Sequence, residues 1–92
     1  MKRILLVVVD LSRSVGDTKA LFEAIKEQGR WWHYMKPMWL IYTDKTPNEV
    51  VEALKPHIQG RGRLMVTYLN RPYQGLLPKD AWEWIRKRVD AE

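Results

Sequence analysis

The stretch RILLVVVD, residues Arg3–Asp10, decides how this chain folds. Its run of apolar residues, rich in β-branched side chains, is typical of a strand buried on both faces. Because side chains alternate along a strand, Ile4, Leu6 and Val8 face one side of the sheet and the residues between them face the other. Both faces then need an apolar cover, and a chain of 92 residues has few helices to supply it. We therefore expect a partner, most simply a second copy.

The segments after this strand predict the rest of the fold. The pattern indicates a helix over residues 17–28, strands over residues 30–35 and 38–44, a second helix from Thr46, a strand over residues 63–69 and a third helix from residues 78–80. The order of the first six elements is that of a ferredoxin-like βαββαβ fold, in which two helices cover one face of a four-stranded antiparallel sheet. We expect an α+β domain with an extra C-terminal helix. No repeat or linker interrupts residues 1–92, which predicts a single domain.

Local signals fix several boundaries of these elements. Thr46-Pro47-Asn48-Glu49 has the pattern of a capping box, with threonine as N-cap, proline at N1 and glutamate at N3. Asp17 suits the start of the first helix and Gly29 its end. Pro37 belongs in the turn between the two aromatic strands, because proline cannot donate to a strand ladder. Pro56 is expected to end or bend the second helix.

Composition narrows the class of protein. Sixteen Lys and Arg against eleven Asp and Glu give a net charge of +5, which favours an acidic partner such as nucleic acid. The absence of cysteine excludes disulfides and thiolate metal sites and is consistent with a cytoplasmic protein. No stretch approaches the roughly 18 apolar residues of a transmembrane helix. We expect a cytoplasmic protein with no membrane partner.

Several stretches, most of them rich in tryptophan, carry a resemblance to known proteins. They are Val-Val-Asp10, the helix that closes on Gly29, residues 31–34 with Trp39-Leu40, and residues 77–84. Together they resemble a group of small bacterial proteins often labelled SinR-like, which are related to the CRISPR-associated Cas-two family. The resemblance covers most of the chain and implies a ferredoxin-like fold that dimerises through its sheets.

The resemblance also implies a role for Asp10. In the wider family, the aspartate that ends the first strand lies near its twin across the dimer axis, where it is proposed to bind a divalent metal for phosphodiester cleavage. In this sequence it matches Asp10. Other members of the wider family hold DNA as scaffolds without catalysis, and relatives of the VapD type are ribonuclease toxins. For the SinR-like group itself, the resemblance implies no function.

Asp10 is thus the one candidate catalytic residue and the one candidate metal ligand. Mg²⁺ and Mn²⁺ prefer oxygen ligands, and Mg²⁺ often needs only one or two carboxylates, which two copies of Asp10 would supply. Such a metal would activate water or stabilise the phosphorane formed during cleavage. The alternative is that Asp10 caps the following turn through the backbone amides of Ser12 or Arg13. No second acid lies close to Asp10 in the sequence.

The candidate nucleic-acid contacts are arginine and lysine side chains, because arginine pairs with phosphate bidentately. They are Arg13 in the loop after the first strand, Arg61 and Arg63 in the turn before the last strand, and Arg86, Lys87 and Arg88 at the end of the third helix. Each group has a structural alternative. Basic residues are common in turns after helices, and cations at a helix C-terminus complement the helix dipole.

The aromatic strands and the two histidines also have two interpretations. The rings of Trp31, Trp32, Tyr34, Trp39 and Tyr42 would form a base-stacking platform on an open sheet, or would pack in the core and in a dimer interface. Their distribution over both faces of the strands favours packing. His33 and His57 could titrate near neutral pH, but neither lies in a pattern that indicates a metal site or a general base.

Three functions follow from the sequence. The leading hypothesis is a nucleic-acid-binding homodimer of Cas-two-like architecture, which could serve as a scaffold. The second is a Mg²⁺- or Mn²⁺-dependent endonuclease or ribonuclease that uses Asp10. The third is a protein-interaction module with no role in nucleic-acid binding.

Overall fold

The structure is a computed structural model that describes residues 1–11, 18–58, 60 and 62–89. The predictions for Ser12, Arg13, Asp17 and Arg61 concern residues outside these ranges. The described elements are β1 (Arg3–Asp10), α1 (Lys19–Lys26), β2 (Arg30–Met35), β3 (Met38–Thr43), α2 (Pro47–Ile58), β4 (Arg63–Tyr68) and α3 (Lys79–Val89). Each lies within a few residues of its predicted range.

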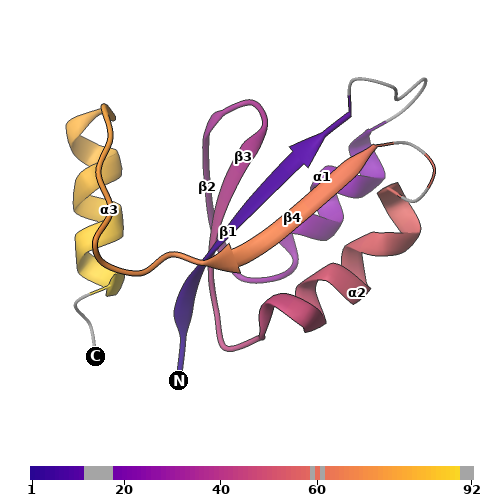
Figure 1. Ribbon diagram of the computed structural model, residues 1–92, viewed down its shortest axis with the longest axis horizontal. Helices are drawn as coiled ribbons and strands as arrows, with labels where there is room; N and C mark the ends of the chain where they lie inside the picture. Colours follow the sequence, from indigo (N-terminus) through magenta and orange to yellow (C-terminus); the bar gives the residue numbers. More distant parts are fainter. Residues whose placement is uncertain (12–17, 59, 61, 90–92) are drawn as a thin grey trace.

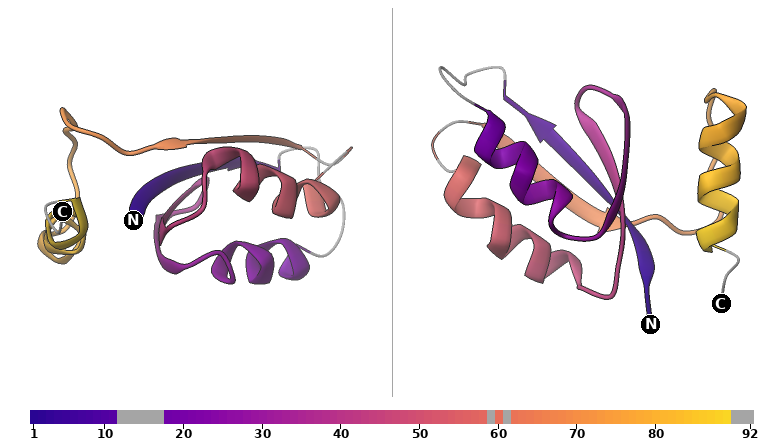
Figure 2. Two further views of the ribbon diagram at one scale, coloured as in Figure 1. Left: turned by 90° about the horizontal axis from the view of Figure 1, so that it is seen from below. Right: turned by 180° about the vertical axis from the view of Figure 1, so that it is seen from behind.

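The four strands form one antiparallel sheet in the order β2-β3-β1-β4. Helices α1 and α2 lie side by side against one face of the sheet, whereas α3 lies apart from them, beyond the far face (Figures 1 and 2). The prediction of an α+β, ferredoxin-like fold with an additional C-terminal helix is confirmed. The central position of β1 explains its apolar sequence, because its neighbours on both sides and the layers above and below it exclude water.

The main core lies between the sheet and the helices α1 and α2. Strand β1 contributes Leu5, Val7 and Val9, and the helices contribute buried leucine, isoleucine and valine side chains. Trp39 and Ile41 of β3 complete this core. The alternation predicted from β1 is therefore confirmed, since its odd-numbered residues face the helices and its even-numbered residues face away.

The ends of α1 and α2 show which local signals hold. The capping box is present, because the backbone N–H of Glu49 donates to Oγ1 of Thr46 at 3.2 Å and the N–H of Thr46 donates to Oε1 of Glu49 at 3.0 Å. Helix α2 ends at Ile58, two residues after Pro56. Pro56 removes only one hydrogen bond near the helix terminus, and the burial of Leu54 and Ile58 on either side keeps the helix in place.

Gly29 follows α1 as predicted, but the requirement for glycine there comes from the sheet. A Cβ on Gly29 would lie 2.3 Å from the carbonyl oxygen of Tyr42 in β3. Only glycine therefore lets the chain enter β2 this close to its neighbouring strand. The next six residues form β2, and Lys36-Pro37 make the predicted turn into β3.

Helix α3 covers part of the far face of the sheet. A second apolar cluster joins Ile4, Trp32 and Leu40 of the sheet to Ala81 and Ile85 of α3, all of them buried. Part of the cover that we expected from a partner thus comes from the chain's own helix, and the partner itself stays a prediction. A connector (residues 69–78) leads from β4 to this helix (Figure 1). An extended connector has no periodic apolar pattern from which the docking of α3 could be foreseen.

The other half of the far face is open. Val8 is half-buried, and Met65, opposite it on β4, is 67% exposed. Met35, near the β2–β3 turn, is also exposed. Apolar side chains thus remain in contact with water over the half of the sheet that α3 does not reach. Within the described ranges, none of the helices has the length and apolar character needed to span a bilayer.

Candidate nucleic-acid interface

The candidate site residues lie at two opposite ends of β1. Asp10 ends the strand beside Arg63, whereas Arg3 begins it at the end of the sheet where Arg88 of α3 also lies. An eight-residue strand is about 23 Å long at about 3.3 Å per residue. Figure 1 shows the start of β1 and the end of α3 at one side of the molecule and the tip of β1 at the other. One phosphate therefore cannot contact both groups within one subunit.

Asp10 is exposed and lies directly across the β1–β4 ladder from Arg63. The carboxylate therefore has a cation as its cross-strand neighbour, and opposite charges at such positions attract each other. Lys36, in the β2–β3 turn, lines the same hollow of about 410 Å³ as Asp10. The backbone is tightly packed here, because a Cβ on Gly62 would lie 2.1 Å from the carbonyl oxygen of Asp10.

These surroundings bear on the predicted metal site. No three acidic, histidine or cysteine side chains come together within the described residues to hold a metal ion. One carboxylate with two cations beside it does not by itself make up a Mg²⁺ or Mn²⁺ site. The predicted site thus requires the Asp10 of a second copy, and one subunit alone does not fit the ion.

The opposite end of β1 has a different character. A narrow cleft of about 60 Å³ is lined by Lys2, Arg3, Asn70 and Arg88, with apolar side chains at its base. We call these four residues the cationic cleft. Nη2 of Arg3 donates a hydrogen bond to Oδ1 of Asn70, and its guanidinium lies 4.0 Å from the centre of the Tyr68 ring. These two contacts hold the Arg3 side chain in one orientation, on the face of the sheet that Tyr68 shares with α1 and α2.

Arg88 is held in the same way by groups of α3 and β3. Its Nη1 donates to the backbone carbonyl of Trp84 at 3.1 Å, and its guanidinium lies 4.2 Å from the Trp84 ring centre. The Tyr42 ring lies 5.7 Å from the guanidinium of Arg88 and 5.9 Å from Nζ of Lys2. The Nε–H of Arg88 is buried and has no acceptor among the described residues. A buried donor without an acceptor is uncommon in a folded protein.

The cationic cleft carries an uncompensated positive charge. Within the described part of the chain, no carboxylate lies within ion-pair distance of Lys2, Arg3 or Arg88. Burial lowers the pKa of Arg88, and the nearby charge of Arg30 lowers it further. Arg30 is therefore close enough to Arg88 to repel it, and an anion bound beside Arg88 would relieve that repulsion.

The basic triplet at the end of α3 does not act as one patch. Residues two apart on a helix differ in direction by about 200°, so Arg86 and Arg88 lie on opposite sides of α3. Arg86 borders Tyr73 and Trp82, whose rings stack at 6.1 Å. Lys87 is exposed. The structure thus brings only Arg88 of this triplet together with the cations of β1.

The aromatic residues do not form one open platform. Trp39 is buried in the main core and Trp32 is buried under α3. His33 stacks on Trp39 with ring centres 3.7 Å apart, and its Nδ1 lies 2.9 Å from the carbonyl oxygen of Met38. The proton must therefore lie on Nδ1, which donates to that carbonyl. The arrangement gives His33 a structural role.

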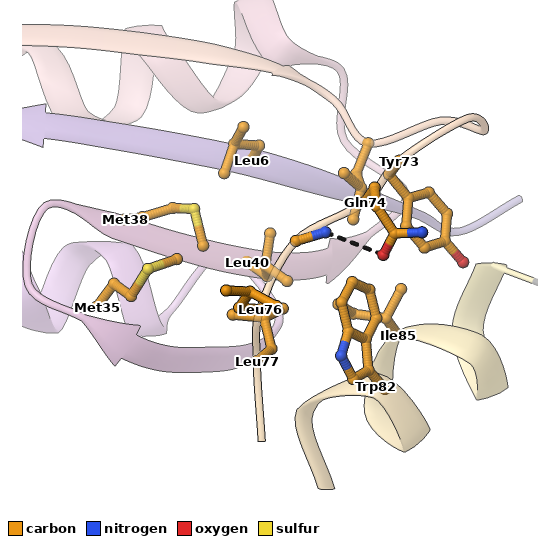
Figure 3. Close-up of a pocket in the computed structure, with 12 residues that line it drawn as sticks. Leu6, Met35, Met38, Leu40, Tyr73, Gln74, Leu76, Leu77, Trp82 and Ile85 are labelled. Carbon is orange, nitrogen blue, oxygen red and sulfur yellow. Dashed lines mark hydrogen bonds between the residues drawn. The ribbon is translucent and has the colours of Figure 1, made fainter. Parts of the chain in front are cut away.

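An apolar groove of about 390 Å³ lies on the far face between the sheet, the connector and α3. Met35 and Met38 come from the hairpin, Leu76 from the connector and Trp82 from α3, and Figure 3 shows their side chains around the same space. We call this the far-face groove. None of its lining residues is charged. Leu76, at its border, is 100% exposed.

Comparison with known proteins adds nothing to this geometry: no protein family, no curated protein and no solved structure matches the chain. The candidate sites rest on the arrangement of the chain's own residues.

Sequence reasoning identified only part of the cationic cleft. Arg88 was a candidate, but Lys2, Arg3 and Asn70 were not, because they lie far from Arg88 in the sequence. The available signal was Lys2-Arg3 directly before the apolar run of β1, together with the cations in the last turn of α3. Without knowing that α3 docks on the far face, this signal could not be used.

Proposed function

We propose that this chain binds nucleic acid through the cationic cleft, as a homodimer of Cas-two-like architecture. One observation carries the proposal: Lys2 and Arg88 of α3 both lie near the Tyr42 ring at one narrow cleft, with no carboxylate of the described residues close enough to neutralise them. Holding a guanidinium group and an ammonium group close to one ring is costly unless an anion binds them. The net charge of +5 would attract a polyanion toward the cleft.

A salt series tests the binding. We expect a fluorescently labelled duplex or single strand to bind at about 50 mM salt, with an affinity that falls steeply as salt increases. Lys2→Ala should weaken binding and make the salt slope shallower by about 0.9, the value for one lost phosphate contact on duplex DNA. Lys55→Ala is the matched control, because it removes one exposed positive charge from α2, on the other side of the sheet. Equal effects of both variants, or no binding at low salt, would contradict the proposal.

The far-face groove supports the dimer part of the proposal. Two chains of net charge +5 repel each other, and the groove is a surface where they can meet without bringing charged side chains together. An interface with two-fold symmetry must be complementary to itself. The groove provides a hollow, and the exposed Leu76 beside it provides a side chain that can enter the hollow of a second copy.

Sedimentation tests the dimer. We expect a mass of two 11.0 kDa chains at micromolar concentration. Leu76→Glu should shift the protein to monomer, because it places a charge in an apolar interface. Ala53→Glu, at an exposed position of α2, is the matched control and should leave the dimer intact. A wild-type protein that sediments as a monomer would show that the groove does not bind a second copy.

One observation favours a second function, metal-dependent cleavage. Asp10 is exposed on the same face as Val8 and Met65, so a dimer formed through this face could bring two copies of Asp10 together. Cleavage of DNA or RNA that requires Mg²⁺ or Mn²⁺ and is lost in Asp10→Asn would establish it. Cleavage that persists in the variant would come from a contaminant. If neither binding nor cleavage is observed, the protein-interaction module becomes the better hypothesis.

A further inference from the structure

We infer that a second hollow, between the connector and α3, binds an unpaired base of a single-stranded nucleic acid. This hollow measures about 310 Å³ and is lined by Tyr73 and Gln74 of the connector and by Trp82 and Arg86 of α3. We call it the aromatic hollow. The inference rests on the proposed function, because it specifies the form of nucleic acid that the protein prefers.

The rings of Tyr73 and Trp82 provide a surface on which a base can stack. Their centroids are 6.1 Å apart and their planes differ by 15°, so the two rings lie nearly parallel. Both residues are half-buried and line the aromatic hollow, which leaves part of the ring pair accessible from it. Aromatic side chains bind the bases of single strands by stacking, and they tolerate any sequence because every base has a π-face.

Arg86 supplies the positive charge that a nucleotide needs beside its base. Its side chain is exposed, and no carboxylate of the described residues lies within ion-pair distance of it. Arg86 follows Trp82 by four residues in α3, so the two side chains are neighbours on one face of the helix. A guanidinium group pairs with two phosphate oxygens at once. A phosphate next to the stacked base would therefore meet Arg86.

Gln74 adds a hydrogen-bonding group to the aromatic hollow. Its Oε1 accepts from the backbone N–H of Gly75 at 3.1 Å (Figure 3), which identifies the oxygen of the amide. The Nε2 group is thus the donor that this side chain can offer to a ligand. Unpaired bases carry acceptors on their edges, so a base stacked beside Gln74 has a group that can receive this hydrogen bond.

The lining of the aromatic hollow distinguishes it from the far-face groove. Tyr73, Gln74 and Trp82 line both, but the groove is otherwise lined by apolar residues, whereas Arg86 completes the aromatic hollow. A ring pair with a cation beside it suits a ligand that joins a planar ring to an anion. A nucleotide has both groups. The volume lies at the lower end of the range of small-molecule sites, about 300–1,000 Å³, which suits one base.

Two single strands of equal charge test the contact with a base. One is a short oligothymidylate, and the other has the same length and the same number of phosphates but carries abasic sites. Their affinities for the wild-type protein are measured by fluorescence anisotropy at one salt concentration. We expect the strand with bases to bind about five- to 150-fold more tightly, the range measured for stacking of one base on an aromatic side chain.

Two pairs of variants assign this preference to the aromatic hollow. Tyr73→Leu keeps an apolar side chain but removes the ring, so it should reduce the preference for bases at least about fivefold, whereas Tyr73→Phe should keep it. Arg86→Ala should weaken both strands and make the salt slope shallower by about 0.7, the value for one phosphate contact on a single strand. Lys87→Ala, the matched control, removes a charge at the next residue, which does not line the hollow, and should leave the slope unchanged. Circular dichroism checks that each variant is folded.

A duplex of the same length separates the aromatic hollow from the cationic cleft. Its bases are paired and stacked on one another, so they cannot enter the hollow. Tyr73→Leu should therefore leave the affinity for the duplex unchanged, whereas Lys2→Ala should weaken the binding of duplex and single strand alike.

The outcomes separate this inference from the proposed function. If the two single strands bind equally and Lys2→Ala weakens both, the inference is wrong and nucleic-acid binding by the cleft stands. If the preference for bases is unchanged in Tyr73→Leu, or if Arg86→Ala and Lys87→Ala have equal salt slopes, the base binds elsewhere and the inference is also wrong. If no oligonucleotide binds, both the inference and the proposed function are wrong.

Discussion

Replacing Ile85 by alanine tests whether α3 is part of the folded protein in solution. Ile85 is 2% exposed and packs with Ile4, Trp32 and Leu40 of the sheet. The substitution removes three carbons, which at about 0.8 kcal/mol each gives a loss of about 2.4 kcal/mol. The cavity left behind adds to this, so the free energy of unfolding should fall by about 2–5 kcal/mol. A loss of 1 kcal/mol lowers Tm by roughly 4–8 °C in a domain of this size, so the midpoint should fall by about 10 °C or more.

Urea denaturation followed by tryptophan fluorescence and by circular dichroism measures this loss. Glu83→Ala is the matched control, because Glu83 is exposed on the same helix and its replacement should change stability by less than about 0.5 kcal/mol. If Ile85→Ala costs no more than Glu83→Ala, α3 is not docked on the sheet in solution. The cationic cleft would then lose Arg88, and the arguments that depend on this cleft would fail.

Three further predictions concern local contacts. Gly62→Ala should lower the free energy of unfolding by about 1–3 kcal/mol, because the new Cβ meets backbone at 2.1 Å. In the same urea titration, Gly75→Ala should be neutral or stabilising by up to about 1 kcal/mol, because its new Cβ meets no atom within 4 Å. Thr46→Ala should cost about 0.5–2 kcal/mol through loss of the helix cap, and a thermal midpoint equal to wild type would contradict this. The hydrogen bond to Asp80 raises the pKa of Tyr34, so stability from this bond is present below about pH 10 and lost as pH rises through the raised pKa. The stability difference between wild type and Tyr34→Phe should therefore shrink from about pH 8 to about pH 11, and a constant difference would disagree.

The sequence predicted those features that depend on residues close together in the chain. The alternation in β1 and the capping box at Thr46 both follow from local spacing, and both are confirmed. Helix α2 continues for two residues past Pro56, because the tertiary packing of Leu54 and Ile58 outweighs the local preference.

The candidate sites were less accessible to sequence reasoning. The end of β1 at Asp10 was recognised, but its cross-strand neighbour Arg63 depends on the register between β1 and β4, which no local pattern specifies. The cationic cleft depends on the docking of α3, which places Arg88 near the same Tyr42 ring as Lys2. That docking is determined by apolar contacts between segments far apart in the sequence, so the cleft becomes visible only in the folded chain.

The position of Arg88 on α3 links ligand binding to the docking of that helix. Lys2 directly precedes the central strand, so a ligand held by both Lys2 and Arg88 also holds α3 against the sheet. By thermodynamic linkage, whatever favours the docked helix raises affinity for the ligand, and bound ligand stabilises the docked helix by the same free energy. A saturating oligonucleotide should thus slow amide hydrogen exchange along α3 more than along α2, which contributes no side chain to the cleft.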